Sequence, residues 1–151
     1  MTPQAIAEAV RDTMLAKDHA SRSLGIECLQ IAPGTSTVAM SVREAMLNGF
    51  GACHGGIITT VADTAFGLAC NSHNVWTVAS GFDVDIVAPA FEGDVLTASA
   101  AEVSRAGRTG VYDITVRNQT GKLVAVFRGR SYSVKGKAVV LAVSAMSAVS
   151  A

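Results

Sequence analysis

Charged side chains are scarce in this sequence, and aromatic side chains are scarcer still. Asp, Glu, Lys and Arg make up 16% of the 151 residues, 12 acidic against 12 basic, and 5% of the residues are aromatic. The balanced formal charge excludes a nucleic-acid or membrane-surface partner that is recognised through bulk charge. Half of the chain is apolar, which excludes a disordered protein and predicts one domain with a real core.

Cysteines are few, and long apolar runs are absent. Three cysteines without a spacing pattern, Cys28, Cys53 and Cys70, argue against a disulfide framework and predict a reducing, cytoplasmic location. No stretch is apolar over enough residues to predict a membrane span, and the N-terminus shows no signal-peptide pattern. No spacing of His, Cys and Asp predicts a metal site, and no cofactor is predicted.

The sequence does contain a regular succession of elements. Thr2 and Pro3 mark a helix start, and helical spacing of apolar residues predicts a helix over residues 3–17. Two strands, a loop over 43–53 and a long central helix to about Asn71 follow, and the period then changes to two. The predicted strands are residues 24–31, 35–42, 77–87, 94–104, 110–117 and 122–134.

This order predicts an α+β fold in which an antiparallel sheet of about six strands wraps around the long central helix. We assign residues 1–135 to this single domain, because no repeat or linker interrupts it. Residues 136–151 form an apolar tail. A frayed helix, a contact with another subunit and disorder all remain open for this tail.

The central helix carries one acid in apolar surroundings. Asp63 is the sole Asp, Glu, Lys or Arg between Glu44 and Asp83. Burying an unpaired carboxylate costs several kcal/mol or raises its pKa, so fold stability alone does not call for this residue. Asp63 is therefore a candidate catalytic residue, and a buried, hydrogen-bonded structural acid is the alternative.

The apolar character of the central helix also predicts that the protein pairs with a second copy of itself. A helix that is apolar on nearly all sides needs cover on every side, and one sheet covers one side. Gly55 and Asp63 are eight positions apart, which is roughly 12 Å along a helix, so Asp63 does not reach a group bound at its own helix N-terminus. Two antiparallel helices about a twofold axis would bring Asp63 of one chain near Gly55 of the other.

These residues resemble a known family. Asn48 followed by His54-Gly55-Gly56, with Ala-Asp-Thr-Ala at 62–65 on a long helix, is similar to the hotdog-fold acyl-CoA thioesterases. The most similar branch belongs to phenylacetic-acid degradation and hydrolyses phenylacetyl-CoA and hydroxyphenylacetyl-CoA. The resemblance covers about residues 20–135. It implies the hotdog fold, an acyl-CoA substrate, and a homodimer with shared active sites that often pairs into a homotetramer.

The resemblance also implies a role for each site residue. Gly55 would give a backbone N–H to the thioester carbonyl, and Asp63 of the partner would act as nucleophile or general base. Asn48 and His54 would position the groups, and Thr64 would support the carboxylate or a water. The chemistry agrees, because a free N–H at a helix N-terminus stabilises the negative charge that hydrolysis builds on the carbonyl oxygen.

Each of these residues also has a structural interpretation. His54 could cap the helix, and Asn48 could cap a turn. A Cys–His nucleophile formed by Cys53 and His54 is disfavoured, because neighbours in sequence need not face each other. His19 and His73 are predicted to be surface groups.

A basic segment between two of the predicted strands is the candidate site for CoA. Arg105, Gly107, Arg108 and Thr109 would bind the CoA phosphates, since Arg pairs with phosphate through two parallel hydrogen bonds. A solvated basic turn is the alternative. Trp76 and Phe82 are expected in the core, with an aromatic acyl pocket as their functional interpretation.

Three functions fit this pattern. An acyl-CoA thioesterase, favoured for arylacetyl groups, agrees with the single acid on the helix and the glycines after His54. A hydratase or dehydratase on the same fold would need a paired acid and base at the β-carbon, and the single acid on the helix and the glycines after His54 fit that chemistry less well. A non-catalytic acyl-CoA binding module would share the groove and the basic segment but would not need Asp63.

Overall fold

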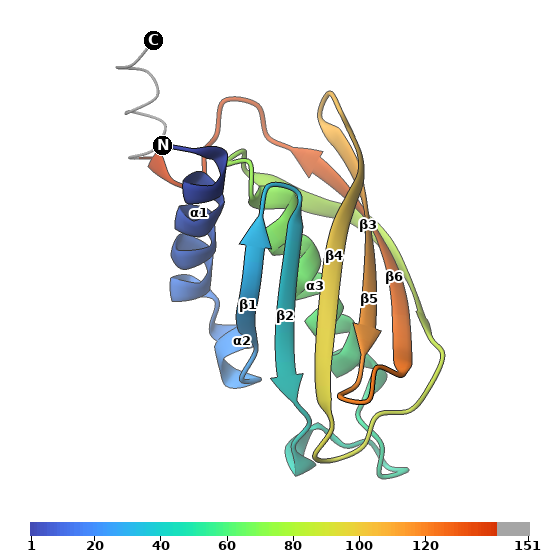
Figure 1. Ribbon diagram of the computed structural model, residues 1–151. Coiled ribbons are helices and arrows are strands. Elements are labelled where there is room, and N and C mark those ends of the chain that lie inside the picture. The colour runs from blue at the N-terminus through green and yellow to red at the C-terminus, as the bar shows by residue number, and fades with distance from the viewer. Residues whose placement is uncertain (142–151) are drawn as a thin grey trace.

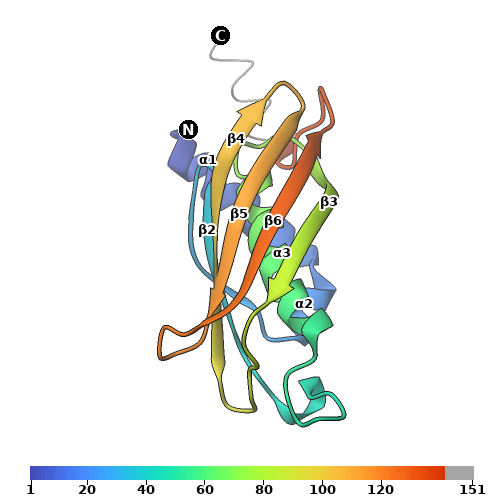
Figure 2. The ribbon, with the colours of Figure 1, turned by 90° about the vertical axis from the view of Figure 1, so that its right-hand side faces the viewer.

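The computed structural model describes residues 1–141 and places one curved six-stranded sheet around a long helix (Figures 1 and 2). All strand pairs are antiparallel, and the strand order is β1-β2-β4-β5-β6-β3. The helices are α1 (Pro3–Lys17), α2 (His19–Ser23) and α3 (Gly55–Asn71), with a short 3-10 helix η1 (Glu44–Met46). The strands are β1 (Glu27–Ala32), β2 (Thr35–Ser41), β3 (Thr77–Ile86), β4 (Val95–Ala106), β5 (Thr109–Arg117) and β6 (Leu123–Ser133).

The helix ends follow their capping residues. Thr2 accepts a hydrogen bond from the Ala5 N–H at 3.1 Å, and Pro3 is the first residue of α1, as the sequence predicts. At the end of α3 the Asn71 side chain accepts from the Thr77 N–H at 2.9 Å and donates to the Thr77 carbonyl at 3.0 Å. These two bonds fix the point where the chain leaves α3 and enters β3.

The core lies between α3 and the concave face of the sheet. Alternate residues of β2 and β5 are buried, as the period of two requires. Phe66 of α3 packs with Tyr112 and Phe127 at ring-centroid distances of 5.6 and 5.8 Å. Helix α1 packs against β1 and α3 at one side of the sheet (Figure 1). The predicted α+β architecture with six strands is confirmed.

The structure corrects two predicted segments. Residues 24–26 are not part of β1, because helix α2 ends at Ser23 and Gly25 takes a positive φ of 70° before the strand begins. Arg105 was predicted in the connection between two strands, but the structure does not place it there. It lies in β4, which continues to Ala106, so that the turn to β5 consists of Gly107 and Arg108. The glycine, with φ of 59°, makes this two-residue turn possible.

Helix α3 is not apolar on all sides. Its buried residues face the sheet, whereas Gly56, Thr60, Asp63 and Gly67 recur every three or four positions on a face that the described residues leave at least partly uncovered. Asp63 belongs to this face and is not in the core of the single chain. The prediction of an acid buried among apolar residues is therefore wrong for the monomer, because the small and polar residues of α3 gather on one stripe.

The edge strand β3 adds a second uncovered surface. Within residues 1–141 this strand pairs with β6 alone, and its other edge carries no strand. Val78, Phe82 and Ile86 of β3 are each more than two-fifths exposed. In the same part of the chain, no helix has the length and apolar character to cross a membrane. The cytoplasmic location remains a prediction.

The tail prediction falls partly outside the described residues. Residues 134–141 are described and fold back over the connection between α3 and β3. Residues 142–151 lie outside the described part of the chain, so the alternatives for them are untested. The proposed division at residue 135 is likewise untested.

Candidate active site

The N-terminus of α3 is the first component of the site. His54 is its N-cap residue, and the His54 Nδ1 atom accepts a hydrogen bond from the Gly56 N–H at 3.2 Å. The capping interpretation of His54 is thus confirmed. Because Nδ1 accepts, the proton of the neutral ring belongs on Nε2, where it is available to a ligand. Among the described residues none accepts a hydrogen bond from the Gly55 N–H.

The Ile86 side chain packs directly against the backbone of Gly55. A Cβ atom at this position would lie 2.8 Å from the Cδ1 atom of Ile86, which is the last described residue of β3. The backbone of α3 and the end of β3 therefore approach closely at this point. The approach leaves the peptide N–H as the group that position 55 can offer to a substrate.

Asn48 holds the loop in front of α3. Its Oδ1 atom accepts from the N–H groups of Phe50 and Ala52, at 2.9 and 3.2 Å. The turn-capping interpretation is confirmed, and the position of Asn48 five residues before Cys53 keeps it in the loop that leads to Gly55. The Cys53 thiol contacts the His54 carbonyl at 3.8 Å, not the imidazole, and burial raises the pKa of this thiol. Neither fact favours a Cys–His nucleophile.

Asp63 lines a cavity on the uncovered side of α3. This cavity, called the α3 cavity below, has a volume of about 570 Å³ and lies among α1, α2, α3 and the start of β3. Its lining includes Met14, Ser21, Asp63, Thr64, Trp76 and Val139. Partial desolvation in this cavity raises the pKa of Asp63 above its ordinary value, and the negative charge of Asp18 raises it further.

Thr64 contacts α2 and does not bond to Asp63 within the described chain. Its hydroxyl donates to the Thr60 carbonyl at 2.8 Å and lies 3.2 Å from the Ser21 hydroxyl. Ser21 is buried and donates to the Asp18 carboxylate at 2.6 Å. Asp18 is in turn the N-cap of α2, since it accepts from the Ser21 N–H at 2.9 Å. The contact between the Ser21 and Thr64 hydroxyls thus places α2 beside the residue next to Asp63.

The structure separates the predicted CoA residues from Gly55 of the same chain. Arg105, Gly107, Arg108 and Thr109 are all exposed, at the β4–β5 turn. That turn lies at the end of the sheet where α3 finishes, whereas Gly55 lies at the opposite end (Figure 1). Arg108 donates to the Tyr132 hydroxyl at 3.2 Å, and Thr109 donates to the Ala106 carbonyl at 3.2 Å.

Sequence reasoning missed part of the cavity lining and misplaced three residues. Trp76 and Phe82 were expected in the core, but they are 40% and 41% exposed, and Trp76 lines the α3 cavity. His73 was expected at the surface, but its side chain is largely buried and bonds to Glu102. Asp18 and Ser21 were not singled out. The Asp-x-x-Ser spacing of an N-cap was the signal that could have found α2.

Comparison with known proteins identifies the class. The family model of the thioesterase superfamily matches residues 50–125. This range includes most of the loop before α3, the whole of α3, strands β3, β4 and β5, and the first residues of β6. The curved antiparallel sheet around one long helix is the hotdog fold of this class. The chain belongs to the thioesterase superfamily.

One relative, matched both in sequence and in structure, narrows the comparison. The acyl-coenzyme A thioesterase PaaI of Escherichia coli is 44% identical over 123 residues, which are 82% of this chain and 88% of that protein. The solved structure of E. coli PaaI, from the phenylacetic acid degradation operon, matches with a TM-score of 0.88 at 40% identity and covers 90% of this chain and 99% of that one. The predicted resemblance to PaaI-type thioesterases is confirmed, as are the hotdog fold and the enzyme class, a thioester hydrolase.

A second solved structure contains a ligand. A Streptococcus mutans protein solved with bound acetyl CoA matches with a TM-score of 0.71 at 26% identity. The match covers 74% of this chain and 90% of that chain.

Proposed function

We propose that this protein hydrolyses acyl-CoA thioesters to the free acid and CoA, with arylacetyl-CoA esters such as phenylacetyl-CoA or hydroxyphenylacetyl-CoA as the preferred substrates. The observation that carries the proposal is Asp63, an acid in a 570 Å³ cavity on the same helix as the unpaired N–H of Gly55. That volume is in the usual range for small-molecule sites. The identity with E. coli PaaI, an acyl-coenzyme A thioesterase of a phenylacetic acid operon, supports the substrate class.

The proposed site is shared between two chains. Eight positions of helix separate Gly55 from Asp63, roughly 12 Å at 1.5 Å per residue, so one chain alone does not bring them together. Two chains that join along the free edge of β3 would bury the apolar residues of that strand and continue the sheet. Their α3 helices would then lie antiparallel, with the small residues of the uncovered face in contact and Asp63 near the partner's Gly55. Pairing of such dimers into a homotetramer remains a prediction.

The reaction adds water across the thioester C–S bond. With Asp63 as general base, its carboxylate takes a proton from water while the water oxygen bonds to the carbonyl carbon. The carbonyl oxygen becomes negative and accepts a hydrogen bond from the Gly55 N–H at the positive end of the α3 dipole. When the intermediate collapses, the C–S bond breaks, and the CoA sulfur leaves and takes up the proton.

Asp63 could instead attack the carbonyl carbon itself, which would give a mixed anhydride that water then hydrolyses. After a single turnover in H₂¹⁸O, label in the peptide that contains Asp63 shows the anhydride route, because water has then attacked the aspartyl carbon. Label in the product acid arises from the general-base route and equally from water attack on the acyl carbon of the anhydride.

His54 and Asn48 are proposed to position the substrate, and Thr64 to hold the helix turn that carries Asp63. Arg105, Gly107, Arg108 and Thr109 are proposed to bind the CoA phosphates. In an antiparallel pair the β4–β5 turn of one chain lies at the same end as Gly55 of the other. The turn and Asp63 of one chain would then serve the same thioester as the partner's Gly55.

A panel of acyl-CoA esters with a thiol reagent that reports free CoA tests the proposal. We expect release of CoA from phenylacetyl-CoA and hydroxyphenylacetyl-CoA, with a higher kcat/KM than from acetyl-CoA. Parallel measurements with enoyl-CoA esters detect hydration, which consumes the double bond without releasing thiol. Binding of the esters without either reaction would favour the binding-module alternative and contradict the proposal.

A further inference from the structure

Residues 134–140 form a strap that the rest of the fold holds in place. After β6 the chain crosses the connection between α3 and β3, where the Val134 N–H donates to the Trp76 carbonyl and the Trp76 N–H donates to the Lys137 carbonyl, both at 2.8 Å. The Lys137 ammonium lies 3.8 Å from the centroid of the Trp76 ring, which is a cation–π contact. These contacts fix the path of the strap across the end of α3.

Asn74 holds the far part of the strap. Its Oδ1 atom accepts from the Val140 N–H at 2.8 Å, and its Nδ2 atom donates to the Val140 carbonyl at 3.2 Å. The backbone of Asn74 is in the left-handed region, with φ of 64°. Between the Lys137 and Val140 contacts, the side chain of Val139 is half-buried and lines the α3 cavity.

The α3 cavity extends along the second half of α3. Asp63, Thr64 and Ser21 line its first end, beside the middle of α3, and Trp76 and Val139 line its second end, together with Asn71 and Thr77. Asp63 and Asn71 are eight positions apart, so these two ends are separated by roughly 12 Å along the helix. An acyl group whose thioester carbon is at Asp63 would therefore extend toward Trp76 and Val139.

We propose that the strap is the end wall of the acyl pocket, and that Val139 and Trp76 set the length of the acyl group that the enzyme accepts. The inference rests on the proposed function, because it concerns the specificity of the same site. The indole ring supplies a flat apolar face for an aromatic or aliphatic acyl terminus, and the Lys137 ammonium on that ring restrains it. Val139 closes the remaining space. The specificity of the enzyme would then depend on residues that follow the last strand of the domain.

The test compares full-length Val139→Ala and Val139→Phe with the wild-type protein on straight-chain acyl-CoA esters of increasing length and on phenylacetyl-CoA. One methylene that fits or fails to fit an apolar pocket changes kcat/KM by about tenfold or more. We expect Val139→Ala to gain about tenfold on esters one or two carbons longer than the wild-type optimum. Val139→Phe should lose about tenfold or more on the longest esters relative to its own activity on acetyl-CoA. Opposite shifts from two variants at one position are not produced by a general loss of folding.

Two further variants complete the experiment. Leu141→Ala is the matched control. Leu141 directly follows the strap, but it is 75% exposed and is not part of the cavity lining. Its length profile should equal that of the wild type. Asn74→Gly keeps the left-handed backbone and removes both bonds to Val140, and it should broaden the profile toward longer esters.

The outcomes separate this inference from the proposed function. Hydrolysis by the wild type with the same length profile in both Val139 variants would overturn the end-wall role and leave the thioesterase proposal standing. No hydrolysis of any ester by the wild type would overturn the proposed function, and the end-wall role with it.

Discussion

The hydroxyl of Ser21 lies 3.2 Å from the hydroxyl of Thr64, and this contact joins the short helix α2 to the central helix beside Asp63. Asp18 completes the link, because it accepts hydrogen bonds from both the N–H and the hydroxyl of Ser21. The carboxylate of Asp18 therefore has a fixed place on the same side of the α3 cavity as Thr64. This arrangement makes the charge of Asp18 a part of the environment of Asp63.

The first prediction concerns the pH dependence of hydrolysis. Desolvation raises the pKa of Asp63, and Asp18 raises it further, so activity that needs the carboxylate falls as the pH drops through this raised value. Asp18→Asn removes the like charge but keeps a good N-cap for α2. We expect the acid limb of the pH profile of kcat/KM to move to lower pH. Asp12→Asn, an exposed change on α1, should leave the limb in place. If the acid limb of Asp18→Asn stays in place or moves to higher pH, the charge of Asp18 does not raise the pKa of Asp63.

The second prediction concerns Asp63 itself. Asp63→Asn should fold, because the side chain lies on the uncovered face of α3 and makes no hydrogen bond within residues 1–141. Its kcat should fall by at least about 100-fold, the lower range for loss of a general base. Circular dichroism and thermal unfolding verify the fold, and steady-state kinetics give kcat. Turnover within a few-fold of the wild type would remove Asp63 from the mechanism.

The third prediction tests whether the site is shared. An Asp63→Ala chain lacks the acid, and a Gly55→Ala chain adds a methyl group that hinders the approach of the thioester to the N–H of position 55. Each homodimer then has two damaged sites, but a heterodimer of the two contains one site with both halves intact. The Cβ of Gly55→Ala meets the end of the Ile86 side chain, which can rotate, so the fold should survive. We expect mixing to restore up to about half of the wild-type activity per heterodimer. Verified heterodimers without recovered activity would count against sites made by two chains.

The fourth prediction is that Arg105 and Arg108, at the β4–β5 turn, act in CoA binding and not in the chemical step. Arg105→Ala/Arg108→Ala should raise KM for CoA esters and leave kcat unchanged, because a contact of equal strength in ground and transition states affects KM alone. Each exposed phosphate contact is worth at most about 1.5–3 kcal/mol, and salt should reduce it further. A short thioester without the nucleotide should be hydrolysed as by the wild type. Arg117→Ala, at the opposite end of β5, is the matched control. A loss of kcat shared by both substrates would end the phosphate-binding assignment.

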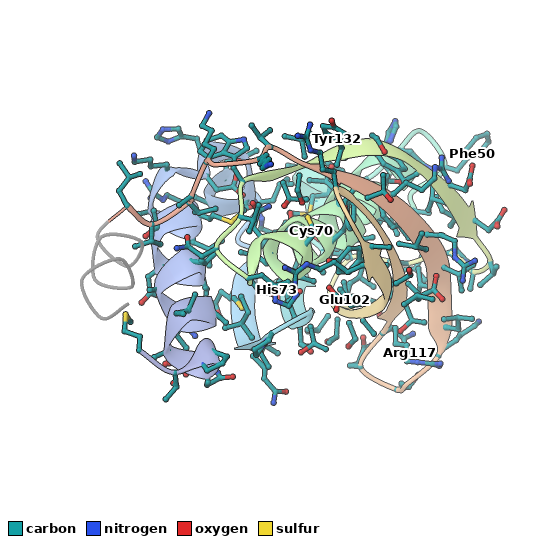
Figure 3. The ribbon with its side chains drawn as sticks, turned by 90° about the horizontal axis from the view of Figure 1, so that it is seen from above. Phe50, Cys70, His73, Glu102, Arg117 and Tyr132 are labelled. Carbon is teal, nitrogen blue, oxygen red and sulfur yellow. The ribbon has the colours of Figure 1, made fainter. Side chains whose placement is uncertain are left out.

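The fifth prediction concerns stability. Glu102 of β4 accepts hydrogen bonds from the Tyr112 hydroxyl at 2.8 Å and contacts His73 Nε2 at 3.0 Å, and Figure 3 shows His73 and Glu102 side by side. Partial burial by itself would raise the pKa of Glu102, but the bonds from Tyr112 and His73 outweigh it, so the pKa is lowered. Because the pKa of Glu102 is lower in the folded protein than in the unfolded chain, ionised Glu102 stabilises the fold at a pH above its unfolded-state pKa of about 4.3. This stability is lost as the pH falls through the pKa of Glu102 in the folded protein.

Tyr112→Phe removes one of these bonds. We expect the free energy of unfolding at pH 7 to fall by about 1.5–3 kcal/mol, and the loss to shrink in acid as Glu102 is protonated. Denaturant titrations at pH 7 and at pH values below about 4 measure both effects. Tyr132→Phe is the control, since the Tyr132 hydroxyl bonds to Arg108 at the surface and its loss should cost little. Equal destabilisation by Tyr112→Phe at every pH would show that Glu102 is not coupled to Tyr112.

Local sequence patterns predicted α1, the six strands and the two ends of α3, but not the short helix α2. The cap at His54, the stop at Asn71 and the alternation in β2 and β5 depend on residues within a few positions of one another, and so the sequence predicted them. The family motif supplied Asn48, Gly55 and Asp63, because these residues lie in one short stretch.

Tertiary packing alone decided what surrounds Asp63. Ser21 meets Thr64 across 43 positions, and Asp63 and Val139 line one cavity although 76 positions separate them. Such contacts depend on how α2 and the strap after β6 pack against α3, which no local period encodes. The uncovered face of α3 was missed for the same reason, because composition counts apolar residues but does not say which side of a helix the sheet covers.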